Sequence, residues 1–484
     1  MTFNSWEFLL FYPIVALLYF ILPKKMKWPM LLLASYFFYA CYQAELIFLI
    51  VGTTLVSFIA SHIIERTDKK WLKRLSLTVT LIVCFGVLFF YKYFNFLSGS
   101  VSGVIEMLGG KPSRLELDLI LPVGISFYTF QTLSYVIDVY RGDVKAERNF
   151  FFYALFVSFF PQLVAGPIER PGNLIPQLCE SHKFTAENFK KGSKHMIVGF
   201  FKKICVADLV SVYVNEVYNS PEEATALGVI IATALFAVQI YCDFSGYTDI
   251  AIGCARIMGI RLMKNFDHPY RAESIKEFWS RWHISLSTWF KDYLYFPLGG
   301  SRCKKWRHLM NLMIVFLVSG LWHGAAWTFV VWGAIHGIYQ VIGTLTIGPR
   351  NRLLEKIGLS KDSIGVKIAR RIITFILVCF GWLFFRANSM SDAVLLLKTL
   401  VTGWGGTAGT LSAMGLSLTA IATTVLSILI LVMIDSLLRY EDAPDGSDAL
   451  TKNGAFIYFI WIILFAWGLL LSKDMMSTFI YFQF

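Results

Sequence analysis

Packing alone does not readily explain three histidines near the middle of the chain, His283, His323 and His336, and their side chains can do acid–base chemistry. His323 follows the apolar run 309–318, which places it at the end of a predicted membrane span. A histidine at membrane depth is by default a predicted functional residue. Because imidazole titrates near neutral pH, it can take a proton from a hydroxyl and return it to a leaving group. The pattern therefore predicts acid–base chemistry at His323, as acyl transfer requires.

Small and aromatic residues surround His323. Gly320 and Gly324 remove side-chain bulk, so another backbone or a thin ligand chain can come close. Acyl transfer also needs donors for an oxyanion, which His283, indole N–H groups or Ser319 could supply. The residues predicted to line the substrate path are Trp282, Ser319, Trp322, Gly324 and Trp327.

The other two histidines receive different predictions. His283 lies in residues 275–289, where apolar residues recur at helical spacing, so we expect one amphipathic helix in or beside the membrane interface. His336 follows His323 by 13 residues, about 20 Å if the segment is helical, so the two cannot easily act on one atom. We expect His323 to react and His336 to pack through a hydrogen bond to a neighbouring helix.

Charged residues near these histidines have structural and functional interpretations. Asp243 and Asp249 lie in an apolar stretch, where acids are costly and usually paired. We expect them to be structural, with Arg256, Arg261 or Arg271 as partners.

A basic cluster precedes the span that leads to His323. It is either a cytoplasmic flank or a rim that binds the phosphates of a nucleotide-containing donor. Its members are Arg302, Lys304, Lys305 and Arg307.

The composition indicates elements that span a membrane. The 484 residues are 56% hydrophobic and 16% charged, whereas soluble domains have about 25% charged residues. An aromatic share of 16% suits helices with aromatic belts, and a β-barrel is not favoured. The net charge of +12 is first a topology signal, so no nucleic-acid partner is predicted. The eight cysteines form no CxxC pair, and no disulfide or metal site is predicted.

Twelve apolar windows are long enough to be considered as spans, and we expect eleven or twelve crossings. They lie at residues 7–23, 28–43, 45–64, 76–95, 116–138, 149–165, 225–242, 308–322, 325–345, 369–386, 413–437 and 454–472. Basic loops after the first and third windows predict an outward N-terminus and an uncleaved first span. Helix breaks are expected near 121–131 and 161–170, and a surface loop at 439–453. The prediction is one all-α polytopic domain over 1–484, with re-entrant or amphipathic helices and a catalytic block at about 240–340.

The combined motifs resemble the membrane-bound O-acyltransferase family. The resemblance is strongest to the bacterial branch with the alginate O-acetyltransferase membrane subunits, and teichoic acid D-alanylation proteins are more distant. The matching segments are 122–131, 162–168, 241–251, 278–287, 293–300, 320–324 and 479–484. They include Arg281-Trp282-His283 and Trp322-His323-Gly324 and spread over most of the chain.

The resemblance implies an hourglass of helices with a central tunnel in a bacterial inner membrane. It makes His323 the catalytic histidine and His283 the second active-site residue. The acyl donor would be a cytoplasmic thioester, acetyl-CoA in this branch, with no bound cofactor. An extracytoplasmic partner of the serine-hydrolase type would complete O-acetylation of a polysaccharide.

Two alternatives stay open at this point. The same family includes enzymes that take a D-alanyl group from a carrier protein, which the basic rim could also dock. A transporter or flippase would explain the spans and the acids within them, although no internal repeat is visible and the aromatic helix around His283 does not favour it.

Overall fold

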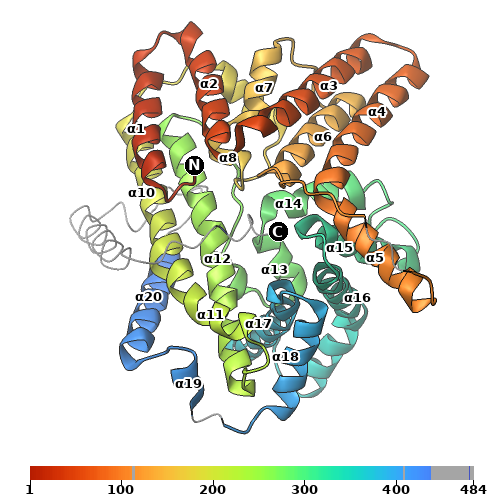
Figure 1. Ribbon diagram of the computed structural model, residues 1–484, viewed down its shortest axis with the longest axis vertical. Helices are drawn as coiled ribbons and strands as arrows, with labels where there is room; N and C mark the ends of the chain where they lie inside the picture. Colours follow the sequence, from red (N-terminus) through yellow and green to blue (C-terminus); the bar gives the residue numbers. More distant parts are fainter. Residues whose placement is uncertain (112–114, 407–408, 438–478, 480–484) are drawn as a thin grey trace. The chain divides into compact units, whose positions relative to one another are not determined.

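The computed structural model describes residues 1–111, 115–406, 409–437 and 479 (Figure 1). Over these residues all regular structure is helical. The predicted loop 439–453, the window 454–472 and residues 480–484 lie outside the described part of the chain. Two units make up the fold: residues 1–196 with 248–264, and residues 197–247 with 265–484. The prediction of one domain over 1–484 stays a prediction.

The first unit contains the helices from the N-terminus to α9 and most of α10. They are α1 (Trp6–Ile21), α2 (Lys24–Gln43), α3 (Ile47–Arg66), α4 (Lys70–Leu88), α5 (Phe94–Met107), α6 (Ile125–Arg141), α7 (Phe150–Ser158), α8 (Phe160–Leu163), α9 (Pro171–Cys179) and α10 (Ala186–Phe200). Helices α3, α4 and α6 pack side by side (Figure 1).

The second unit contains the histidines. Its helices are α11 (Leu209–Asn219), α12 (Ala226–Ile257), α13 (Ile275–Arg281), α14 (Ile284–Phe290), α15 (Lys305–His323), α16 (Trp327–Lys356), α17 (Ile364–Arg386), α18 (Met390–Thr402), α19 (Thr410–Ala413) and α20 (Leu418–Leu437). The last turns of α12 belong to the first unit.

Six helical runs among the described residues are long and apolar enough to cross a membrane. They are Lys24–Arg66, Lys70–Met107, Ala226–Ile257, Trp327–Lys356, Ile364–Arg386 and Leu418–Ser436. The first run contains two of the predicted windows. They correspond to α2 and α3, which the extended backbone of Gln43 separates. Other predicted windows fall on shorter or less apolar helices: α1, α6, α7 and α15. The protein is thus an all-α, multi-pass membrane protein, as predicted.

The two predicted helix breaks contact each other in the first unit. The chain before α6 turns at Gly124, whose φ is 73°, and a Cβ there would lie 2.5 Å from the carbonyl oxygen of Leu163. Residues 164–169, which follow α8, are buried without being helical. Non-helical backbone at membrane depth is tolerated where protein covers it. The non-helical backbone of residues 164–169 is therefore buried in protein.

Helices α15 and α16 approach each other at two glycines. A Cβ on Gly320 would lie 2.3 Å from the carbonyl oxygen of Phe329 and 3.2 Å from the Cα of Gly333. A Cβ on Gly333 would lie 2.4 Å from the carbonyl oxygen of Phe316. Small residues at helix crossings allow such close backbone contact in membranes. Gly320 thus admits another backbone, one of the two interpretations that the sequence left open.

A larger residue in place of Gly320, where α15 and α16 cross, should destabilise the protein. Gly320→Ala places a methyl group against backbone that cannot move aside, and overpacking costs about 1–3 kcal/mol. We expect a lower midpoint of thermal unfolding for the purified protein in detergent. Gly343→Ala in α16 is the matched control, because nothing lies within 4 Å of its Cβ position. Equal midpoints for the two variants would contradict the close crossing.

Candidate active site

His283 and His323 lie together in the interior of the second unit. Their ring centroids are 6.5 Å apart. The exposed fractions of the two residues are 0% and 3%. His283 immediately precedes α14 and His323 is the last residue of α15. Residues 40 positions apart in the sequence are thus brought into one buried pair.

The turn after His323 brings the third histidine nearer than its sequence separation suggests. Gly324, Ala325 and Ala326 are not helical, and α16 runs back along α15. The rings of His323 and His336 each lie 5.0 Å from the ring of Trp332, so they are within twice that distance of each other. The predicted separation of about 20 Å is therefore wrong, because it assumed one continuous helix.

His336 has the hydrogen bond to a neighbouring helix that the sequence predicted. The indole Nε1–H of Trp279 in α13 donates to Nδ1 of His336 at 3.1 Å. A neutral imidazole that accepts at Nδ1 carries its proton on Nε2. Gly381 in α17 makes room for that nitrogen, since a Cβ at this position would lie 2.8 Å from Nε2. His336 thus lies between α13 and α17, with Trp332 between it and His323.

The predicted amphipathic helix is broken where His283 occurs. Helix α13 ends at Arg281 and α14 begins at Ile284, and the backbone of His283 is left-handed, with a φ of 44°. The expectation of one continuous helix over 275–289 is therefore wrong. A left-handed backbone is uncommon for a residue with a Cβ and costs about 1–3 kcal/mol. The surrounding structure must compensate for this cost.

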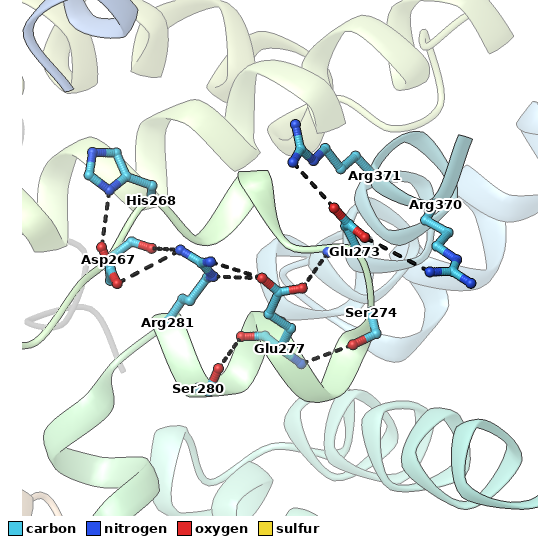
Figure 2. A network of polar contacts seen from close by, with 9 residues as sticks. All are labelled: Asp267, His268, Glu273, Ser274, Glu277, Ser280, Arg281, Arg370 and Arg371. Carbon is cyan, nitrogen blue, oxygen red and sulfur yellow. Dashed lines mark hydrogen bonds and ion pairs between the residues drawn. The ribbon is translucent and has the colours of Figure 1, made fainter. Parts of the chain in front are cut away.

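A polar network holds the start and end of α13 (Figure 2). Arg281 pairs with Glu277 at 2.9 Å and donates to the backbone oxygen of Asp267 at 3.1 Å. The backbone N–H of Asp267 donates in turn to the carbonyl of Arg281 at 2.9 Å. Glu273, before α13, lies within ion-pair distance of Arg370 and Arg371 in α17. The loop before α13 is thereby fixed against the junction where His283 lies.

Asn265 is a residue of this site that the sequence predictions missed. It is 1% exposed, and its side-chain Oδ1 lies 3.1 Å from Nδ1 of His283. Burial lowers the pKa of His283 from its ordinary value of 6.5 to about 3. His283 is therefore neutral over the whole physiological range of pH.

Aromatic rings surround the histidine pair. Trp322 contacts both rings, with centroid distances of 5.9 Å to His283 and 5.0 Å to His323. Phe244 lies 4.7 Å from His283, and Phe385 lies 5.5 Å from His323. Such surroundings strengthen every electrostatic interaction within them because they contain little water.

The residues predicted to line a substrate path differ in their placement. Trp282 is fully buried, Trp322 and Ser319 are buried, and Trp327 at the start of α16 is 55% exposed. The ring of Phe329 lies where a Cβ of residue 324 would be, so Gly324 is needed for packing of that ring. Contact of these residues with substrate stays a prediction.

The basic rim lies at the far end of α15 from His323. Arg302, Lys304 and Lys305 are exposed and Arg307 is half-buried. Helix α15 has 19 residues, which corresponds to about 27 Å between the rim and the histidine. The order of the motifs along the sequence suggests that the rim lies near His323, whereas α15 separates the two by about the thickness of a membrane core.

The predicted acids have partners other than the expected arginines. Asp243 pairs with Lys203 at 2.7 Å, and Lys203 also pairs with Asp208 at 2.8 Å. Asp249, in the first unit, lies 3.8 Å from Nδ1 of His195. The structural role expected for both acids is consistent with these contacts, and their partners among the described ion pairs are Lys203 and His195. Lys203 comes from a π-helical segment, Phe201–Asp208, that α-helical spacing does not predict.

A buried pair of histidines among aromatic rings, in an all-helical membrane protein, is typical of a membrane enzyme. The model of the membrane-bound O-acyltransferase family matches residues 145–385, which include the whole histidine cluster. The chain is 34% identical to the probable alginate O-acetylase AlgI of Azotobacter vinelandii, with full coverage of both proteins. It therefore belongs to the membrane-bound O-acyltransferase family and is an O-acyltransferase.

Two further relatives show the breadth of the family. The chain is 35% identical to the peptidoglycan O-acetyltransferase of Helicobacter pylori, over 81% of the chain and 78% of the relative. It is 28% identical to the teichoic acid D-alanyltransferase of Bacillus subtilis, over 57% of the chain and 71% of the relative. The O-acetyltransferases thus match more of the chain at higher identity.

The contacts of Arg281 predict an effect on activity. Arg281→Gln removes the guanidinium group that joins Glu277 to the loop before α13. The loss should be substantial, because hydrogen bonds to charged groups contribute about 1.5–3 kcal/mol. We expect a transfer rate about tenfold lower, measured with purified protein and labelled acyl donor. Arg371→Gln is the control, because this residue is 46% exposed and surface ion pairs contribute about 0–1 kcal/mol. The same loss in both variants would show that the loop does not depend on Arg281.

Proposed function

We propose that the protein transfers an acetyl group from cytoplasmic acetyl-CoA across the membrane for O-acetylation of an extracytoplasmic polysaccharide. The buried pair of His283 and His323 is the observation that carries this proposal. The names of the O-acetyltransferase relatives support acetyl as the group and a polysaccharide as the acceptor. D-alanyl transfer is not favoured, because the relative with that name matches less of the chain. A transporter without acyl chemistry does not fit the family.

In the proposed reaction a hydroxyl oxygen of the acceptor attacks the carbonyl carbon of the thioester. His323 takes the hydroxyl proton as the new C–O bond forms. The C–S bond then breaks, and the proton passes to the leaving sulfur, so the products are an O-acyl ester and a free thiol. His283 orients His323 or shares the proton. This uses imidazole as both base and acid within one step of group transfer.

The developing oxyanion needs donors in the buried site. The indole N–H groups of Trp282 and Trp332 have no hydrogen-bond acceptor among the described residues. The ring of Trp332 lies 5.0 Å from that of His323. Buried donors that point at the charge formed in a transition state stabilise it strongly. These two tryptophans support the expectation that indole groups supply this function.

The donor would bind by its phosphates at the rim that contains Arg302, Lys304, Lys305 and Arg307. Three of these side chains are exposed, and guanidinium and ammonium groups bind phosphate well. The thiol arm would then extend along α15 toward His323. An acyl carrier protein stays the alternative donor. We further propose a serine-hydrolase-like extracytoplasmic partner that completes the transfer to the polymer, and a central tunnel through which the acyl group passes.

Removal of the proposed base should abolish activity. We expect His323→Ala to lower transfer from [14C]acetyl-CoA by about 10²-fold or more, because the general base is lost. His62→Ala in α3 is the control: this half-buried histidine bonds a carbonyl of its own helix and should keep the full rate. Normal transfer by a well-expressed His323→Ala variant would contradict the proposal.

His336 should matter much less than His323. Its Nδ1 accepts the indole proton of Trp279, which indicates a packing role. We expect His336→Ala to lower thermal stability and to reduce the rate per folded molecule by far less than His323→Ala does. The comparison requires both rates, normalised to the folded fraction from size-exclusion chromatography. Equal losses would mean that the two histidines are assigned wrongly.

A further inference from the structure

Asn265 accepts hydrogen bonds from the junction between α13 and α14. Its backbone oxygen accepts from the N–H of Ile284 at 2.9 Å. Its side-chain Oδ1 accepts from the N–H of Ser285 at 3.2 Å and from the hydroxyl of Ser285 at 2.8 Å. The same oxygen lies 3.1 Å from Nδ1 of His283. One carboxamide oxygen thus meets three polar groups of this junction.

These contacts determine where the proton of His283 lies. A backbone N–H can only donate, so the Asn265 atom that faces Ser285 must be the oxygen and not the amide nitrogen. An amide oxygen can only accept, so Nδ1 of His283, which faces the same oxygen, must carry the proton. A neutral imidazole protonated at Nδ1 has its lone pair on Nε2.

The groups that face His283 come from three helices and a loop. Helix α12 contributes the ring of Phe244, and the neighbouring Asp243 is paired with Lys203. Helix α15 contributes Trp322 and His323. Helix α14 and the loop contribute Ser285 and Asn265. Among these described contacts the titratable group next to the ring is His323, so a new charge at position 265 would act directly on His283.

We propose that Asn265 is a positioning residue of the transferase, which fixes the Nδ1–H tautomer of His283 and so reserves Nε2 as a proton acceptor. This inference rests on the proposed function, because it gives His283 the task of receiving the proton that His323 takes from the acceptor. In that relay the proton moves from the hydroxyl to His323, is shared with Nε2 of His283, and leaves on the thiol. The other tautomer would present an N–H and could not accept it.

Asn265→Asp separates this role from packing. A carboxylate keeps the shape and an acceptor oxygen for all three donors, and it adds a negative charge beside Nδ1–H. That charge stabilises the imidazolium and raises the pKa of His283, so neutral His283 requires a higher pH. We expect the acid limb of the profile of kcat/KM against pH to move upward by about 1–3 pH units, with the plateau retained. The assay is transfer or hydrolysis of [14C]acetyl-CoA by the purified full-length protein.

Two further variants complete the design. Asn265→Leu removes the acceptor, and we expect a loss of about 10²- to 10⁴-fold that no pH restores. Asn311→Asp is the matched control, since Asn311 is equally buried and donates to the carbonyl oxygens of Leu298 and Gly300. Its acid limb should stay at the pH of the unaltered protein. If Asn265→Leu does not fold, the shift of the acid limb in Asn265→Asp remains as the test of the tautomer role.

The outcomes distinguish this inference from the proposed function. An unshifted acid limb in Asn265→Asp, or a folded Asn265→Leu variant with a normal rate, overturns the tautomer role. If this occurs while His283→Ala and His323→Ala are inactive, the proposed function stands. If His283→Ala keeps the full rate, both the role of His283 and the inference are wrong.

Discussion

The left-handed backbone of His283 is the constraint on which the histidine pair depends. It separates α13 from α14 and turns the imidazole toward α15 instead of leaving it on the face of one continuous helix. Such a backbone is unfavourable by about 1–3 kcal/mol unless other contacts fix it. Asn265 binds the two residues that follow, and Arg281 binds the loop that contains Asn265. The contacts of Arg281 in Figure 2 therefore support the site although they lie outside the aromatic shell.

Neutral polar groups and aromatic rings contact the histidine pair. The described groups that contact His283 include an amide, a hydroxyl, aromatic rings and a second imidazole. Among the described buried ions of this unit, Lys203 is paired with both Asp208 and Asp243. Such pairing matters because an unpaired charge in a medium of low dielectric would shift the protonation of either histidine by several pH units. Neutral imidazoles are the forms that accept a proton, so the arrangement suits a base and its relay.

The sequence predicted the fold class, and it identified as candidates the two histidines that the structure brings together, because both depend on patterns that are local. Apolar windows identify membrane helices, and the Trp-His motifs identify His283 and His323. It did not predict what depends on the path of the backbone. The end of α15 at His323 brought His336 nearer than helical spacing allowed, and the π-helical segment placed Lys203 against Asp243. Asn265 had no periodic or motif signal, because its contact with His283 spans 18 residues through a loop and a left-handed turn.

The length of α15 constrains how a donor can be used. The rim at its start and His323 at its end are about 27 Å apart, close to the thickness of the hydrocarbon core. If a donor binds at the rim, as proposed, its arm must extend over most of this length before the thioester carbonyl reaches the histidines. The distance along α15 is therefore a geometric requirement that the proposed binding mode places on any donor.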